Sequence, residues 1–211
     1  MKNVKSIWLV LSLAIGSFSA TTQAGGMVLD TGIPDNSKSP LTLDASNFLA
    51  AEFSLGAGQT NIHTIQAYIN AGNSGAEGDL FTIALYSADV SSGLPVGDQL
   101  WSGHATYLAD GWNGLDNVYV SGLTAGNYWV AFEVGSDNDT AGLLMPVIAT
   151  NGSLPALAYA FNDGSGYRPM TGENFGVRVT VPEPDTLWLF GIGLLPFVFR
   201  KGILKNITEA R

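Results

Sequence analysis

Short runs in which apolar and polar residues alternate fill the middle of the chain. In residues 79–86, for example, Phe81, Ile83 and Leu85 fall on one side of an extended backbone. Alternation with a period of two is typical of a β-strand that buries one face. Similar runs predict further strands at 47–55, 61–69, 99–107, 117–120, 128–134, 143–149, 156–161 and 175–181. Glycine-rich stretches separate most runs and no long helical period intervenes, so the pattern predicts an all-β, antiparallel sandwich.

The first 24 residues have the pattern of a signal peptide. Lys2 and Lys5 precede an apolar core at residues 7–18, and small residues at Thr22 and Ala24 suit a signal peptidase. We therefore expect a signal-peptide helix over residues 1–24, with cleavage before Gly25. The alternative is an uncleaved anchor helix, against which the short apolar core argues.

The last 31 residues begin with a stiff turn and continue into an apolar run. Residues 187–199 carry no charge, and Asp185 stands where it would cap a helix. As a helix these 13 residues span roughly 20 Å, short of a bilayer core of roughly 30 Å. Arg200 and Lys201 follow and favour a cytoplasmic C-terminal end. We expect a hydrophobic membrane helix here; the alternative is a buried strand or helix of a soluble domain.

The segment between these two ends is strongly acidic. Residues 25–180 contain three basic residues and 15 acidic residues, a net charge of −12. This charge argues against nucleic acid or anionic lipid as a partner of the body. The chain has no cysteine, which excludes disulfides, thiolate metal sites and cysteine nucleophiles. At roughly 155 residues, the segment is long enough for one domain with its own core.

The order of parts in the C-terminal segment resembles the PEP-CTERM sorting signal. The matching features are the motif Val181, Pro182, Glu183, Pro184, the apolar run, and the basic pair Arg200 and Lys201. This signal marks exported proteins of Gram-negative bacteria that make exopolysaccharide. The resemblance implies recognition by an exosortase, a membrane-embedded cysteine protease or transpeptidase that removes the tail. Before processing, the segment would hold the protein in the membrane.

The body is similar, less specifically, to the choice-of-anchor domains found upstream of such tails. This resemblance spans residues 51–181 and implies a jelly-roll-like β-sandwich without assigned catalytic residues. Its carrying segments are 81–87, 93–95, 123–130 and 175–179. We therefore divide the chain into a signal peptide (1–24), an exported β-sandwich domain (25–180) and a sorting or anchor segment (181–211). Residues 25–43 are expected to form an irregular lead-in to the domain.

One aromatic side chain in a predicted turn suggests a sugar-binding site. Trp112 is flanked by Asp110 and Asn113, and Tyr107 is close in sequence. Sugar-binding sites stack a ring on the flat sugar face and use polar side chains for its hydroxyls. The alternative is a tryptophan folded back over the edge of the sandwich.

An acidic loop is the best candidate for a metal site. Asp137 and Asp139 start a segment that resembles a calcium loop, but Ala141 and Ile148 stand where an EF-hand needs oxygen ligands. An EF-hand is excluded, and a looser calcium site or an ordinary polar turn is left. Glu77 and Asp79 form a similar, weaker candidate.

These observations favour a non-enzymatic exported protein of the cell surface or extracellular matrix. Its processing partners would be a signal peptidase and an exosortase, and extracellular polysaccharide is a candidate ligand. His63 and His104 are the only histidines, and no Ser-His-Asp pattern accompanies them. The alternatives are a carbohydrate- or calcium-binding module, an exopolysaccharide hydrolase using a carboxylate pair, or an ice-binding protein. We expect no cofactor, with calcium the one candidate ion.

Overall fold

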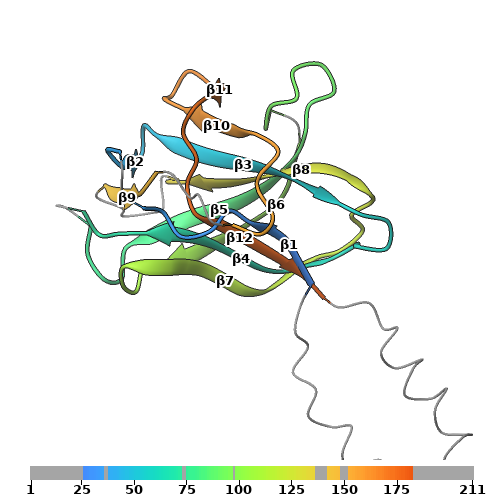
Figure 1. Ribbon diagram of the computed structural model, residues 1–211, viewed down its shortest axis with the longest axis horizontal. Coiled ribbons are helices and arrows are strands. Elements are labelled where there is room, and N and C mark those ends of the chain that lie inside the picture. The colour runs from blue at the N-terminus through green and yellow to red at the C-terminus, as the bar shows by residue number, and fades with distance from the viewer. Residues whose placement is uncertain are drawn as a thin grey trace, which may run out of the picture.

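The computed structural model describes residues 26–35, 38–72, 75–96, 98–135, 142–147 and 152–182. These residues form twelve β-strands and no helix (Figure 1). The strands are β1 (Gly26–Asp30), β2 (Leu41–Leu43), β3 (Phe48–Leu55), β4 (Ile62–Ile69), β5 (Leu80–Ser87), β6 (Gln99–Thr106), β7 (Gly111–Val120), β8 (Gly126–Glu133), β9 (Leu143–Met145), β10 (Tyr159–Asn162), β11 (Tyr167–Met170) and β12 (Val177–Val181).

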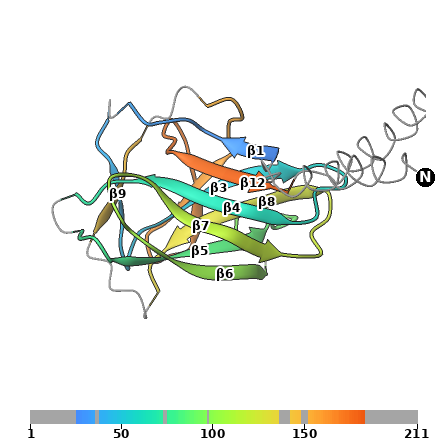
Figure 2. The same ribbon diagram turned by 90° about the horizontal axis from the view of Figure 1, so that it is seen from below.

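Two antiparallel sheets pack face to face, as Figures 1 and 2 show. The smaller sheet has four strands in the order β1-β12-β4-β7. The larger sheet has six strands in the order β11-β10-β3-β8-β5-β6, and β2 pairs with β9 in a separate two-stranded piece. The predicted all-β antiparallel sandwich is therefore confirmed. Jelly-roll connectivity within that class stays a prediction.

The core lies between the two sheets and is made by alternate residues of their strands. Phe81, Ile83 and Leu85 of β5 are each 0% exposed, which confirms their predicted phase. Phe132 of β8 and Ile65 of β4 meet them from other strands, also fully buried. Burying a side chain of this size stabilises a fold by about 1.5–3 kcal/mol.

The expectation of an irregular lead-in over residues 25–43 was wrong. β1 pairs with β12 along the edge of the smaller sheet, and Leu29 of β1 is fully buried in the core. β2 likewise pairs with β9. Five- and three-residue strands are too short to show alternation, so their partners, far along the chain, decide their conformation.

Two other differences concern β7 and β11. The predicted turn at 110–114 is instead the start of β7, which runs ten residues from Gly111. β11 was not predicted, because Pro169 interrupts it. Proline is tolerated there since β11 is an edge strand of the larger sheet.

The two predicted terminal helices fall on residues 1–24 and 183–211, outside the described residues. Within the described ranges, no helix is long and apolar enough to cross a bilayer. The division of the chain at residues 24 and 180 likewise stays a prediction.

Candidate functional site

Trp112 lies on the outer face of the four-stranded sheet, near the start of β7. Tyr68 of β4, its partner in the ladder, meets it edge to face with ring centroids 5.5 Å apart. The guanidinium of Arg178, on β12, lies 4.0 Å from the centre of the Trp112 ring. Arg178 Nε also lies 3.2 Å from Asp30 Oδ1. One face of the indole is thus covered by a cation that is itself paired with a carboxylate.

Asp110 is directed into its own loop. Its Oδ1 accepts hydrogen bonds from the Tyr107 hydroxyl at 2.6 Å and from the Ala71 N–H at 2.9 Å. The Tyr107 bond, followed by the Ala71 bond, lowers the pKa of Asp110. Burial, followed by the bond to Asp110, raises the pKa of Tyr107 to about 12. The carboxylate therefore ties the β6–β7 connection to the end of β4.

Asn113 points inward and is only 4% exposed. Its Nδ2 donates to the carbonyls of Ala109 and Gly111, and its Oδ1 accepts from the Leu108 N–H. These bonds use the amide to hold the turn before β7. The structure therefore places Trp112 on the outer face of the sheet, Asn113 next to it in β7 with a buried side chain, and Asp110 in the exposed loop before β7. A sugar site built from all three stays a prediction.

The predicted calcium ligands Asp137 and Asp139 lie outside the described residues. Of the weaker pair, Asp79 accepts a hydrogen bond from the Ala76 N–H. Across the ranges that the structure describes, no three His, Asp or Glu side chains gather closely enough to hold a metal ion. Calcium binding by the acidic loop stays a prediction.

The sorting motif begins inside the folded sheet. Val181 is the last residue of β12, is 2% exposed, and pairs with Gly26 at the start of β1. Pro182 follows directly; Glu183, Pro184, Arg200 and Lys201 lie outside the described residues. The start of β1 and the end of β12 consequently lie side by side at one end of the sandwich (Figures 1 and 2).

Residues 180–201 match the PEP-CTERM protein-sorting motif. This match confirms the sorting motif inferred from the tail, and it supports an exported protein sorted by an exosortase. The PEP-CTERM motif covers only the tail, so it assigns nothing to the sandwich.

Two further comparisons used the whole chain. No curated protein matches the chain. Among solved structures, one likeness is to the cysteine protease and lectin-like domains of Cwp84, a surface layer associated protein of Clostridium difficile. The identity is 11%, the TM-score is 0.45, and the alignment covers 69% of this chain and 36% of that chain. The match thus spans little more than a third of that structure, and it carries no argument about function.

A second polar group, on the outer face of the six-stranded sheet, was not predicted from the sequence. We call Tyr86, Glu133 and Tyr167 the tyrosine–carboxylate cluster. The hydroxyls of Tyr86 and Tyr167 donate to the same Glu133 oxygen, at 3.0 and 2.5 Å. Burial, followed by the negative charge of Glu133, raises the pKa of both phenols. The outward phase of the predicted strands would have revealed Tyr86 and Glu133, whereas Tyr167 lies on the strand that was missed.

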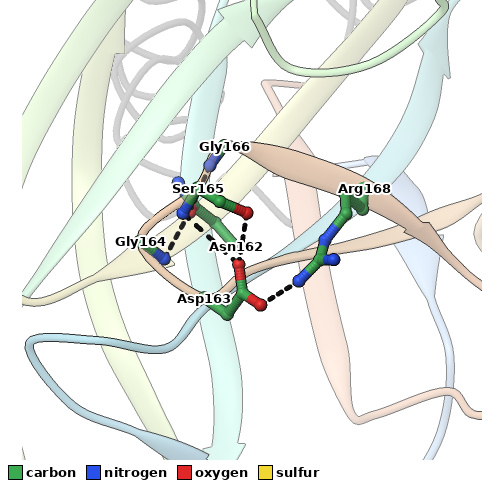
Figure 3. A network of polar contacts seen from close by, with 6 residues as sticks. All are labelled: Asn162, Asp163, Gly164, Ser165, Gly166 and Arg168. Atoms are coloured by element: carbon green, nitrogen blue, oxygen red, sulfur yellow. Dashed lines mark hydrogen bonds and ion pairs between the residues drawn. The ribbon is translucent and has the colours of Figure 1, made fainter.

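Polar side chains of the β10–β11 hairpin hold its turn in place (Figure 3). Asn162 Oδ1 accepts the Gly164 N–H, and Asp163 Oδ1 accepts both the N–H and the hydroxyl of Ser165. Asp163 Oδ2 pairs with Arg168 of β11. These local bonds are typical of turns built on Asn and Asp. They fix the course of β11, which supplies the second phenol of the cluster.

Proposed function

We propose that this chain is an exported, non-enzymatic protein of the cell surface or extracellular matrix of a Gram-negative bacterium. A signal peptidase would remove residues 1–24, and an exosortase would remove the tail. The observation that carries the proposal is the PEP-CTERM match at residues 180–201, which begins on the last strand of a folded antiparallel body. The finer expectation, a jelly-roll body of the choice-of-anchor type, belongs to this proposal.

A structural role for the body is supported by how its polar groups are used. Asp110 holds the β6–β7 connection, and Glu133 joins β8 to β5 and β11. Both carboxylates accept hydrogen bonds from tyrosine hydroxyls of the protein itself. The half-buried carboxylate of Glu133 would be costly without donors, and the exposed carboxylate of Asp110 holds its loop through two hydrogen bonds.

The processing step can be tested by mass spectrometry of the native protein from an exosortase-positive host. We expect no peptide beyond about Asp185 on the mature product. Pro184→Ala should lower the yield of processed protein, because the stiff motif presents the tail to the enzyme. Pro95→Ala, in the β5–β6 loop, is the matched control and should leave processing unchanged. An intact C-terminus through Arg211 on the mature product would show that the tail is not removed.

Polysaccharide binding by the body is a second proposed function. It is favoured by the half-buried Trp112, which shares the outer face of the smaller sheet with Tyr68 and Arg178. In a glycan array, Trp112→Ala should abolish binding because ring stacking is lost. Tyr119→Ala, an exposed aromatic near the other end of β7, is the control. Equal binding by both variants would remove this function from consideration.

Calcium binding is a further proposed property of the acidic loop. Calorimetric titration of the protein with calcium should give a heat signal that Asp137→Ala removes. Asp163→Ala, in the β10–β11 turn, is the matched control because its carboxylate already serves Ser165 and Arg168. A signal that survives Asp137→Ala but not Asp163→Ala would place the site elsewhere.

A further inference from the structure

We propose that the end of the sandwich where β1 begins and β12 stops is a membrane-facing surface. While the tail is uncleaved, this end lies against the lipid headgroups and the opposite end points away from the bilayer. The inference rests on the proposed sorting route, since it needs the apolar tail to be in a membrane.

The short connection between the body and the tail limits how far the two can separate. Five residues, Pro182 to Thr186, lie between the end of β12 and the apolar run. Fully extended residues span at most about 3.5 Å each, so the connection reaches roughly 18 Å. The headgroup layer on one side of the bilayer occupies roughly 5–8 Å of that distance. The end of the body that carries Val181 is therefore held at or near the lipid surface.

Two of the loops at this end carry no charge. β3 ends beside the start of β8, since Leu55 pairs with Gly126, and β4 begins opposite the end of β7. The connecting loops, residues 56–61 and 121–125, contain only glycine, alanine, leucine, threonine, serine, glutamine and asparagine. Figure 2 shows both loops at the end where β1 begins and β12 stops. Uncharged loops can approach headgroups without losing the hydration of an ion.

The loops at the opposite end are acidic. Their carboxylates belong to the β2–β3, β4–β5, β6–β7 and β10–β11 connections: Asp44, Glu77, Asp79, Asp110 and Asp163. A surface that contains anionic lipids repels such groups within about a Debye length. These five carboxylates outnumber Asp89 and Asp98 of the β5–β6 loop, which starts at the tail-bearing end, so the charge favours the same orientation as the tail does.

The β5–β6 loop also starts at the tail-bearing end, and it carries Asp89 and Asp98. The turn of this loop contacts the outer face of the six-stranded sheet. There Trp129 Nε1 donates to the Gly93 carbonyl at 2.9 Å, and Leu94 packs against the sheet. The turn that carries Asp89 is therefore held beside Trp129, whereas Asp98 lies next to the end of β5, at the rim of the uncharged surface formed by the other two loops.

Two exposed side chains suit contact with headgroups. Met27 lies on β1 and Tyr119 on β7, the two edge strands of the smaller sheet, and they are 41% and 83% exposed. Both lie at the tail-bearing end of their strands. Tyrosine is enriched at membrane interfaces because its ring is apolar and its hydroxyl polar. These residues would flank the point where the tail leaves the sheet.

The absence of cysteine makes a labelling test direct. Ala57 lies in the 56–61 loop and Ala109 in the β6–β7 loop at the opposite end, and both are exposed. Each is changed to cysteine, Ala57→Cys and Ala109→Cys, in the chain that extends to Arg211. The nitroxide-labelled proteins are reconstituted with vesicles of phosphatidylethanolamine and phosphatidylglycerol. Collisions of each label with a water-soluble nickel chelate are then measured.

We expect accessibility at position 57 to fall about threefold on vesicles, because the headgroup layer excludes the chelate. Accessibility at position 109 should not change, and a chain ending at Pro182 should show no change at either position. A chain that fails to float with vesicles overturns the sorting route and this inference together. A chain that floats while both labels stay equally accessible overturns this inference alone. Protection of position 57 only after exosortase is added would also overturn it, in favour of contact with the enzyme.

Discussion

Each sheet carries a tryptophan on its outer face, and the two tryptophans differ in how deeply they are buried. On the six-stranded sheet, Trp129 is 1% exposed and is covered by the β5–β6 loop. It packs on four alanines that are almost completely buried although they point away from the main core: Ala50, Ala84, Ala131 and Ala160. On the four-stranded sheet, Trp112 stays half-buried: Arg178 covers one face of its ring and Tyr68 meets it edge to face.

The difference shows that an outward position in a strand pattern does not mean an exposed position. Alanines leave a depression on the sheet, and a loop and a large ring can fill it at close packing. The six-stranded sheet thus has a small second core on its outer face, whereas the four-stranded sheet has a surface on that side. Stability should depend on the first face, and any recognition on the second.

The largest effect should come from removing the ring that fills the second core. Trp129→Ala should lower the free energy of unfolding by about 3–5 kcal/mol, because no other side chain fills the cavity that the ring leaves. Trp112→Ala, at the open face, should cost about 1 kcal/mol from lost packing and the lost cation contact. Urea denaturation measures both. Equal losses in the two variants would erase the distinction between the faces.

An intermediate effect should appear at alkaline pH, through the tyrosine–carboxylate cluster. Tyr86 and Tyr167 have pKa values raised in the folded protein. Their contribution to the free energy of unfolding is fully present below the pKa of about 10 of an unfolded tyrosine. It is lost as the pH rises above that value, because the unfolded chain then ionises more readily than the folded protein. We expect the free energy of unfolding to fall by about 1 kcal/mol between pH 9 and pH 11 through this linkage.

Replacing one phenol should flatten that pH dependence. Tyr86→Phe removes one ionisable hydroxyl, so the alkaline loss should shrink, whereas Tyr119→Phe, at an exposed tyrosine, should keep the wild-type slope. Thermal melts across this pH range give the comparison. A Tyr86→Phe protein with the full alkaline loss would show that the cluster is not its source.

The smallest effect should come from the cation on the open face. Arg178→Met should cost about 0.5–1 kcal/mol, since it removes the contact with Trp112 and the ion pair with Asp30. Arg168→Met is the control on the other sheet, where the pair with Asp163 is more exposed and should cost less. Melts at low and high salt would measure both. A larger loss for Arg168→Met would reverse the ranking.

Alternation predicted the parts of the fold that bury one face of a long strand. It placed Phe81, Ile83 and Leu85 in the core and gave the antiparallel sandwich. It missed β1 and β2, two short strands in the segment read as irregular, and β11, which Pro169 interrupts. It also read residues 110–114 as a turn, whereas Gly114 lies in β7, where a side chain would collide with the β4 backbone.

The candidate sites could be predicted only where they follow one another in sequence. The PEP-CTERM motif is continuous, so its order of residues was sufficient to recognise it. The tyrosine–carboxylate cluster joins residues 34 and 47 positions apart, and strand pairing alone brings them together. The Trp112 surface likewise depends on Arg178, a residue 66 positions later. No local sequence pattern specifies contacts between residues so far apart in the chain.

The pairing of Gly26 with Val181 also has a consequence for the timing of export. The first strand to emerge from the translocation channel must wait for the last one, because β12 lies between β1 and β4. Until the whole body has crossed, the smaller sheet lacks an inner strand and cannot close. The body therefore completes its fold at the time when the sorting motif reaches the outer side. A stalled, half-translocated chain would present neither a finished domain nor a substrate for the sorting enzyme.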